Sequence, residues 1–72
     1  MVIKPFDLMQ KSLNKKVTIR TKDGREFTGK LTSFDDSLNL VLEDAEEVAD
    51  KGRKDRGTMV IKGGNIVYMN KA

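Results

Sequence analysis

The spacing of apolar residues differs between the start of the chain and the rest, and this difference separates a short helix from a series of strands. Near the start, Phe6, Met9 and Leu13 recur at intervals of three and four residues, which places them on one face of a helix. Pro5 suits the first helical position because its missing N–H group has no helical partner there. We therefore predict a helix over about residues 5–13, which must pack on an apolar surface because so short a helix is not stable alone.

Apolar and polar residues then alternate, which predicts a hairpin of two half-buried antiparallel strands. Val17 and Ile19 lie on one face of the first strand, and a turn sequence of Lys, Asp and Gly follows. A three-residue loop pairs Ile19 with Phe27 and places Gly29 opposite Val17, whereas a two-residue loop would set apolar side chains opposite polar ones. We therefore expect the three-residue loop, with Gly24 in the left-handed conformation.

The second strand reaches about Ser33, and a turn and a third strand follow it. Gly29 lies inside the second strand, where the missing side chain predicts a sharp bend that lets the strand curl over the core. Two aspartates and a serine at positions 35–37 predict a turn, since their side chains can bond nearby backbone N–H groups. We expect the third strand from about Leu38 to about Val48, with alternate leucines facing inward.

The last third of the chain predicts a second hairpin. A charged segment between two glycines, about residues 50–57, indicates either a solvated loop or a finger that contacts phosphate. Strands over about residues 58–62 and 66–70 flank a tight turn at 63–65. Both strands are apolar on both faces, which indicates that both faces are covered. The N-terminal helix is one candidate cover, and a neighbouring subunit is another.

These elements predict a single, mainly β domain over residues 1–72, with a short N-terminal helix on a five-stranded, strongly bent antiparallel sheet. A chain of 72 residues buries too little surface to be stable by a wide margin. Domains of this size gain stability from disulfides, metals or association, and the sequence contains no cysteine and no histidine. We therefore expect self-association, in which the edge strands of identical subunits pair head to tail and close a ring.

The charge balance is mildly basic, with 14 basic and 11 acidic residues and a net charge of +3. Such an excess fits a solvated surface of both signs, and only clustering of basic groups on one face would argue for nucleic acid. The apolar runs are far shorter than the roughly 20 residues that cross a membrane, and the start shows no apolar core of a signal peptide. We therefore expect a soluble, cytoplasmic protein without a membrane partner.

Few residues suit catalysis, and binding of single-stranded nucleic acid is the better-supported function. Asp35 and Asp36 could form an acid–base pair, but their place in a turn favours local hydrogen bonds. We therefore expect no enzyme, no cofactor and no metal site. Asn39 follows the turn, and its amide offers an acceptor and two donors that complement a uracil edge, or it simply caps the turn. Asp35 would orient this amide or cap the turn, and Lys62 would meet a phosphate or base or remain merely exposed.

Two segments resemble the paired motifs of the Sm and Sm-like (LSm) proteins. The first lies within about residues 16–48 and carries the pattern Gly29-x-Leu31-x-x-Phe34-Asp35-x-x-Leu38-Asn39-Leu40-Val41-Leu42-Glu43. The second lies within about residues 58–70 and contains Val60-Ile61-Lys62-Gly63-Gly64-Asn65-Ile66-Val67. The compact chain looks most like an archaeal member. The resemblance implies the Sm fold, an SH3-like small barrel, and a ring of most often seven identical subunits, in which the fourth strand of one subunit pairs with the fifth strand of the next.

The resemblance also implies binding of uridine-rich single-stranded RNA near the central opening of the ring, and a role as a scaffold or chaperone in RNA processing. Asn39 matches the family's uracil-reading asparagine, and Asp35 matches the aspartate that supports it. Gly63 matches the glycine in the turn of the second motif. These three positions form the core of the predicted RNA site.

Three further positions of the predicted RNA site depart from the family pattern. Ser37 replaces the usual aromatic or histidine that stacks on the base, Lys62 replaces a stacking arginine, and Gly64 replaces an aspartate near the base. Stacking contributes about 1–3 kcal/mol per base. The departures predict weaker RNA binding or a weaker uridine preference, and they leave a structural or protein-interaction ring as the alternative. An unrelated monomeric small barrel, such as a ribosomal protein, is a second alternative.

Overall fold

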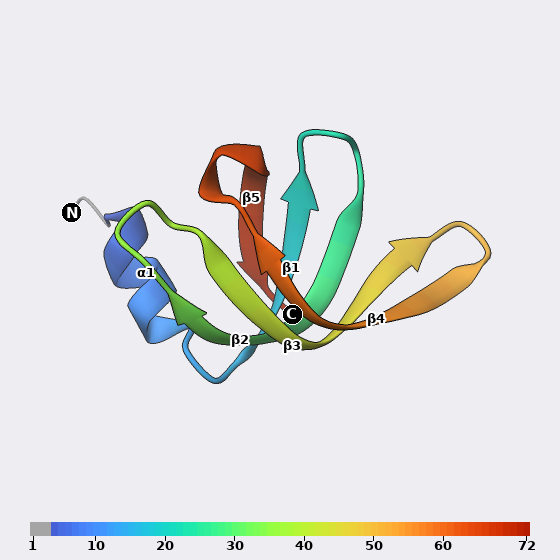
Figure 1. Cartoon of the computed structure of the whole chain (residues 1–72), viewed down its shortest axis with the longest axis horizontal. Helices are drawn as coiled ribbons and strands as arrows, with labels where there is room; N and C mark the ends of the chain where they lie inside the picture. Colours follow the sequence, from blue (N-terminus) through green and yellow to red (C-terminus); the bar gives the residue numbers. More distant parts are fainter. Residues whose placement is uncertain (1–3) are drawn as a thin grey trace.

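The computed structural model describes residues 4–72, and its architecture is mainly β (Figure 1). The elements are α1 (Pro5–Lys11), β1 (Lys16–Thr21), β2 (Glu26–Phe34), β3 (Leu40–Ala49), β4 (Gly52–Ile61), a 3₁₀ helix (Gly63–Asn65) and β5 (Ile66–Lys71). This arrangement confirms the predicted helix and five strands. Among the described residues, no helix is long and apolar enough to cross a membrane. The expectation about a signal peptide concerns the start of the chain, where residues 1–3 lie outside the described residues.

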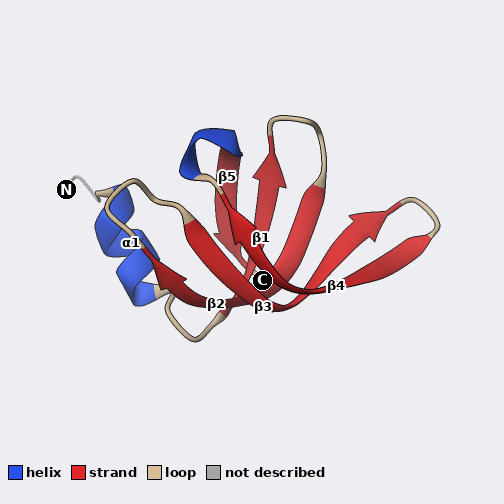
Figure 2. Ribbon diagram, viewed as in Figure 1, coloured by secondary structure: helices blue, strands red, loops and turns tan. Residues whose placement is uncertain are grey.

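All five strands form one antiparallel sheet in the order β4-β3-β2-β1-β5 (Figure 2). Each strand pairs with its neighbour in sequence, except that β5 returns to pair with β1. The sheet bends strongly through β2 and β3 (Figure 1), which confirms the predicted curvature. Within residues 4–72, β4 and β5 therefore carry the two free edges of the sheet.

The register of the β1–β2 hairpin matches the prediction. Ile19 pairs with Phe27, and Val17 pairs with Gly29. Gly24 has a φ of 84°, which is the left-handed conformation expected in this loop. The side chains of Val17, Ile19 and Phe27 are all buried. A shift by one residue would expose all three, so the apolar pattern is sufficient to select the register.

Gly29 lies where β2 bends, as its place inside a strand predicts. The pairing between β2 and β3 shifts here, between Thr28 and Lys30. A Cβ atom at Gly29 would lie 3.0 Å from the Cα of Ala45 and 3.2 Å from the carbonyl oxygen of Glu43. The absent side chain therefore lets the backbone of β3 cross β2 at close range.

The core fills the inside of this bend. Its buried apolar members are Met9, Val17, Ile19, Phe27, Leu31, Leu40, Leu42, Ala45 and Ile61. The helix contributes Met9 to the core, and Phe6 packs edge-on against Phe34 of β2 with 5.2 Å between the ring centres. The apolar face predicted for the helix thus anchors it at the end of β2.

The helix is shorter than the predicted span of about residues 5–13 and ends at Lys11. The N–H group of Asn14 donates to the carbonyl of Leu31 in β2 at 2.6 Å. Asn14 also has a φ of 64°, the left-handed conformation that turns a chain out of a helix. The left-handed Asn14 and its bond to β2 therefore direct the chain from the end of the helix toward β1.

Most of the predicted charged loop over about residues 50–57 is strand, which corrects that prediction. β4 begins at Gly52, so the turn of the β3–β4 hairpin is confined to Asp50 and Lys51. The hairpin extends beyond the rest of the sheet, at the right of Figure 1. Its charged side chains on β4 are exposed, and backbone pairing with β3 needs no apolar residue. Apolar alternation therefore cannot reveal this part of the strand.

The two edge strands leave apolar side chains exposed. Val60 of β4 is 69% exposed, and Val67 of β5 is 58% exposed. The predicted cover by the N-terminal helix is therefore wrong for these two valines, because the helix packs at the end of β2. Because both strands are apolar on both faces, the pattern still indicates that a neighbouring subunit covers these valines.

We expect Gly29→Ala to destabilise the fold by about 1–3 kcal/mol, the usual effect of overpacking. The new methyl group would press on the backbone of β3, which cannot move without disturbing its strand pairs. Urea unfolding at one fixed protein concentration measures the loss. Gly64→Ala is the matched control, since nothing lies within 4 Å of a Cβ at that position. Equal losses in the two variants would contradict the close-approach explanation.

Candidate nucleic-acid interface

The carboxylate of Asp35 organises the turn between β2 and β3. Its Oδ1 accepts hydrogen bonds from the backbone N–H groups of Ser37 at 2.9 Å and Asn39 at 3.0 Å. The N–H group of Leu38 donates to the carbonyl of Asp35 at 2.9 Å. These bonds confirm the predicted turn chemistry, in which an aspartate side chain bonds the backbone that follows it. They place Asn39 directly before β3.

Leu38 adopts a backbone conformation that is rare for a bulky residue, with a φ of 61°. Such a conformation costs about 1–3 kcal/mol. Its side chain packs against the core, and this packing offsets the strain. Sequence reasoning missed this feature, because a leucine gives no signal of a left-handed conformation. The conformation reverses the chain just before Asn39.

The amide of Asn39 bridges two turns. Its Nδ2 donates to Oδ2 of Asp35 at 3.0 Å, and its Oδ1 accepts from the backbone N–H of Gly63 at 2.8 Å. These partners fix which end of the amide carries the oxygen, since an inverted amide would set its oxygen against a carboxylate. One N–H of Nδ2 and one lone pair of Oδ1 remain for a ligand. The amide thus presents one donor and one acceptor side by side.

Gly63 brings the 3₁₀ helix into contact with the Asp35 turn. A Cβ atom there would collide with the carbonyl oxygen of Ser37 and lie 2.9 Å from the carbonyl carbon of Leu38. Backbone atoms cannot yield as the end of a flexible side chain can, so this position requires glycine. Gly64 differs, because the space around its Cβ position is open.

The pKa of the Asp35 carboxyl is lowered from its ordinary value, chiefly by the hydrogen bond from the Asn39 amide. Burial acts in the opposite direction. The backbone N–H groups of Asn39 and Ser37 and the positive charge of Lys62 lower the pKa further. The carboxylate therefore remains ionised at neutral pH, and it keeps the amide of Asn39 oriented.

The residues predicted for the site come from two turns that meet at one end of the sheet. Hydrogen bonds and close backbone contacts join four of them, while Lys62 acts on the site through its charge and Gly64 adjoins it in the chain. Ser37 contributes its backbone to this contact, and its side chain is exposed. Neither turn contains an aromatic residue. The arrangement can therefore bind the polar edge of a planar group, but neither turn itself supplies a ring for stacking.

A model of the LSM domain family matches residues 7–71. The chain belongs to the LSM family. An snRNP Sm-like protein of Methanococcoides burtonii is 44% identical to this LSM domain over 69 residues. The match covers 93% of this chain and 94% of that protein. These matches confirm the resemblance carried by the two sequence motifs, and family membership confirms that the LSM domain is not an enzyme.

Two solved structures share the fold of this LSM domain. A heptameric archaeal Sm protein is 42% identical with a TM-score of 0.85, over 90% of this chain and 96% of that one. The Sm protein of Pyrococcus abyssii, in complex with a uridine heptamer, is 37% identical with a TM-score of 0.84. That match covers 97% of this chain and all of the other. The predicted Sm fold is thereby confirmed.

We expect the stability difference between the wild-type LSM domain and Asp35→Asn to shrink as the pH falls below about 4. The folded-state pKa of Asp35 is lowered, so its stabilisation is complete above the unfolded pKa and is lost as the pH falls through the folded pKa. Thermal unfolding of both proteins across this pH range measures the difference. Asp36→Asn, at the exposed neighbouring position, is the control. A difference for Asp35→Asn that persists unchanged in acid would show that the carboxylate charge is irrelevant.

Proposed function

We propose that this LSM domain assembles into a ring of seven identical subunits and binds uridine-rich single-stranded RNA near the central opening. In this role it acts as a scaffold or chaperone in RNA processing. The observation that carries the proposal is the amide of Asn39, which Asp35 and Gly63 hold in one orientation. A polar group fixed in this way, on an exposed turn, is suited to reading the edge of a base.

The free edges of the sheet support the ring. β4 and β5 lie at opposite edges, and each carries an exposed valine, Val60 and Val67. Pairing β4 of one copy with β5 of the next is a head-to-tail contact, which closes into a ring when the rotation per subunit allows it. The related archaeal Sm protein with 42% identity is heptameric, and this supports a count of seven.

The fixed amide suits the edge of uracil. Oδ1 of Asn39 would accept the N3–H of the base, and the remaining hydrogen on Nδ2 would donate to the adjacent carbonyl oxygen. Because the hydrogen bonds to Asp35 and Gly63 already hold the amide, little conformational freedom is lost on binding. The related Pyrococcus abyssii protein is in complex with a uridine heptamer, and this supports uridine as the base.

Lys62 supplies positive charge for the RNA backbone. Its side chain is exposed, and its charge already acts on Asp35 across the same site. A lysine that contacts phosphate releases condensed cations, so RNA binding should weaken as salt rises. A ring of identical sites multiplies this attraction, because the linked sites engage one RNA strand together.

Three positions limit the strength and base preference of the proposed site. Ser37 provides no ring to stack on a base, and Lys62 is a point charge where a planar arginine would stack. Gly64 has open space where a carboxylate would contact the base. The proposed ring therefore binds RNA more weakly, or with less preference for uridine, than a member with all of these groups.

The alternative function is a structural or protein-interaction ring whose RNA site is weakened. The open space at Gly64 and the missing stacking group at Ser37 favour this alternative. RNA that co-purifies with the protein, seen as a raised ratio of absorbance at 260 nm to that at 280 nm, would favour the RNA-binding ring. A ring that purifies free of RNA and binds no oligonucleotide would favour the alternative.

We expect Asn39→Ala to lower the affinity for oligo-U by about tenfold or more, because two hydrogen bonds per base are lost at about 0.5–1.5 kcal/mol each. The affinity for oligo-A should fall less. Fluorescence anisotropy with labelled oligo-U and oligo-A measures both, and native mass spectrometry checks that the assembly is unchanged. Asn70→Ala, an exposed asparagine on β5, is the control. An unaltered affinity for oligo-U in Asn39→Ala would refute the assigned role of the amide.

We expect Ser37→Tyr to raise the affinity for oligo-U by about fivefold or more, since an aromatic group adds about 1–3 kcal/mol of stacking per base. Ser37→Ala is the matched control and should bind as the wild type does, because the serine provides no stacking. The same anisotropy assay measures both variants. Tight oligo-U binding by the wild type, with strong discrimination against oligo-A and no gain from tyrosine, would show that the missing ring is unimportant.

A further inference from the structure

The amide of Asn39 cannot exchange its oxygen and nitrogen ends. Its Nδ2 donates to Oδ2 of Asp35 at 3.0 Å, and its Oδ1 accepts from the N–H group of Gly63 at 2.8 Å. An ionised carboxylate only accepts hydrogen bonds, and a backbone N–H only donates them. If the amide turned over, both bonds would break, because its oxygen would face the carboxylate and its NH₂ group would face the N–H. The donor and the acceptor that remain for a ligand therefore keep one fixed order.

A fixed order of donor and acceptor distinguishes two classes of base. Uracil and guanine each carry a ring N–H beside a carbonyl group, which is N3–H beside O4 in uracil and N1–H beside O6 in guanine. Adenine and cytosine carry the reverse, an unprotonated ring nitrogen beside an amino group. In the position in which uracil would bind, their amino group would face Nδ2 of Asn39 and their ring nitrogen would face Oδ1. Two donors would then meet, and so would two acceptors, which leaves all four groups without a hydrogen bond.

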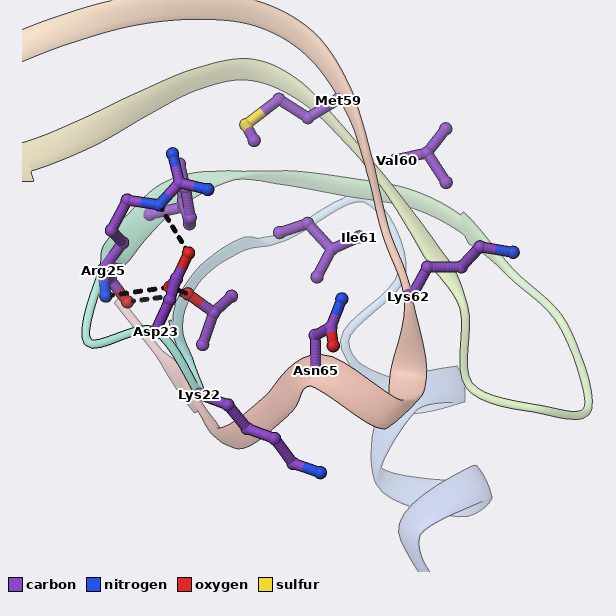
Figure 3. A pocket seen from close by; sticks show the side chains of 10 residues that line it. Lys22, Asp23, Arg25, Met59, Val60, Ile61, Lys62 and Asn65 are labelled. Carbon is purple, nitrogen blue, oxygen red and sulfur yellow. Dashed lines mark hydrogen bonds and ion pairs between the residues drawn. The ribbon is translucent and has the colours of Figure 1, made fainter.

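A base that turned over would reverse the order of its groups, but Lys62 opposes this through the RNA backbone. The side chain of Lys62 extends away from Asp23 and Arg25, which line the opposite side of a cavity of about 320 Å³ (Figure 3). Its positive charge acts on Asp35 of the RNA site instead. Contacts to phosphate set the register and direction of a nucleic-acid strand. A phosphate held by Lys62 at every site would therefore keep each base the same way round.

The two turns around the amide leave room for the larger ring system of a purine. Gly64 has no side chain, and nothing lies within 4 Å of a Cβ at this position, next to the glycine that binds Oδ1. Ser37 on the other turn is small and exposed. We propose that the site recognises a ring N–H beside a carbonyl group, so that it binds guanine as well as uracil and rejects adenine and cytosine. This inference rests on the RNA site of the proposed function, and it specifies a single-stranded RNA of mixed uridine and guanosine.

Inosine and adenosine provide the direct test, because both are purines of the same size and their hydrogen-bonding edges are reversed. Inosine carries O6 and N1–H as guanosine does. Fluorescence anisotropy compares three labelled heptanucleotides, which contain uridine alone, uridine alternating with inosine, and uridine alternating with adenosine. We expect the inosine RNA to bind at least about tenfold more tightly than the adenosine RNA, because each adenosine loses both hydrogen bonds to the amide. Equal affinities for the inosine and adenosine RNAs would overturn the inference.

Asn39→Ala tests whether the amide makes this distinction. Without the amide, we expect the affinities for the inosine and adenosine RNAs to agree within about twofold, whereas Asn70→Ala, at an exposed position of β5, keeps the wild-type ratio. A wild-type ratio in Asn39→Ala would overturn the inference, since another group would then recognise the base. If the wild type binds none of the three RNAs, the proposed function fails and the inference fails with it. If it binds oligo-U but binds the inosine and adenosine RNAs equally, only the inference fails.

Discussion

The site depends on the contact between two backbone turns, made where Gly63 approaches the carbonyl groups of Ser37 and Leu38. A side chain at Gly63 would hold the turns apart, and its N–H could then not reach Oδ1 of Asn39. Asp35 completes the arrangement from the other side, because its carboxylate bonds both the backbone and the amide of Asn39. The orientation of the amide is thus set by two segments 24 residues apart in the chain. The amide of Asn39 is therefore already oriented before a base binds.

The same bend that brings these turns together leaves the sheet open. Gly29 lets β3 cross β2 closely, and the sheet curls around one apolar core. The curled sheet does not close on itself, because β5 pairs with β1 and leaves the edge of β4 free in the described chain. A small barrel with two free edges presents backbone groups and valines to water, which is a liability for a single chain. Repetition of the same chain around a ring removes both edges at once.

Sequence reasoning predicted the structure correctly where the residues present allow only one local arrangement. The pairing of Ile19 with Phe27 follows from keeping apolar side chains on one face, and the Asp35 turn follows from the side chains present. It failed where charged residues form strand, as in residues 52–57, because their pairing is made by the backbone and leaves no apolar pattern. It also could not show why Gly63 is glycine or that Leu38 is left-handed. Those facts depend on which distant backbone atoms come into contact.

The end of β4 and the turn after it serve both proposed interactions. Val60 lies on the free edge strand that would pair with a neighbouring chain in the proposed ring, while Lys62 and Gly63 belong to the RNA site. A ligand that binds the assembled ring better than the free chain must stabilise the ring, and the ring must raise the affinity for that ligand by the same factor. The missing stacking group at Ser37 therefore weakens the ring assembly as well as base recognition. RNA binding then contributes less free energy to the assembly of the ring, so the contacts between subunits must supply more of its stability.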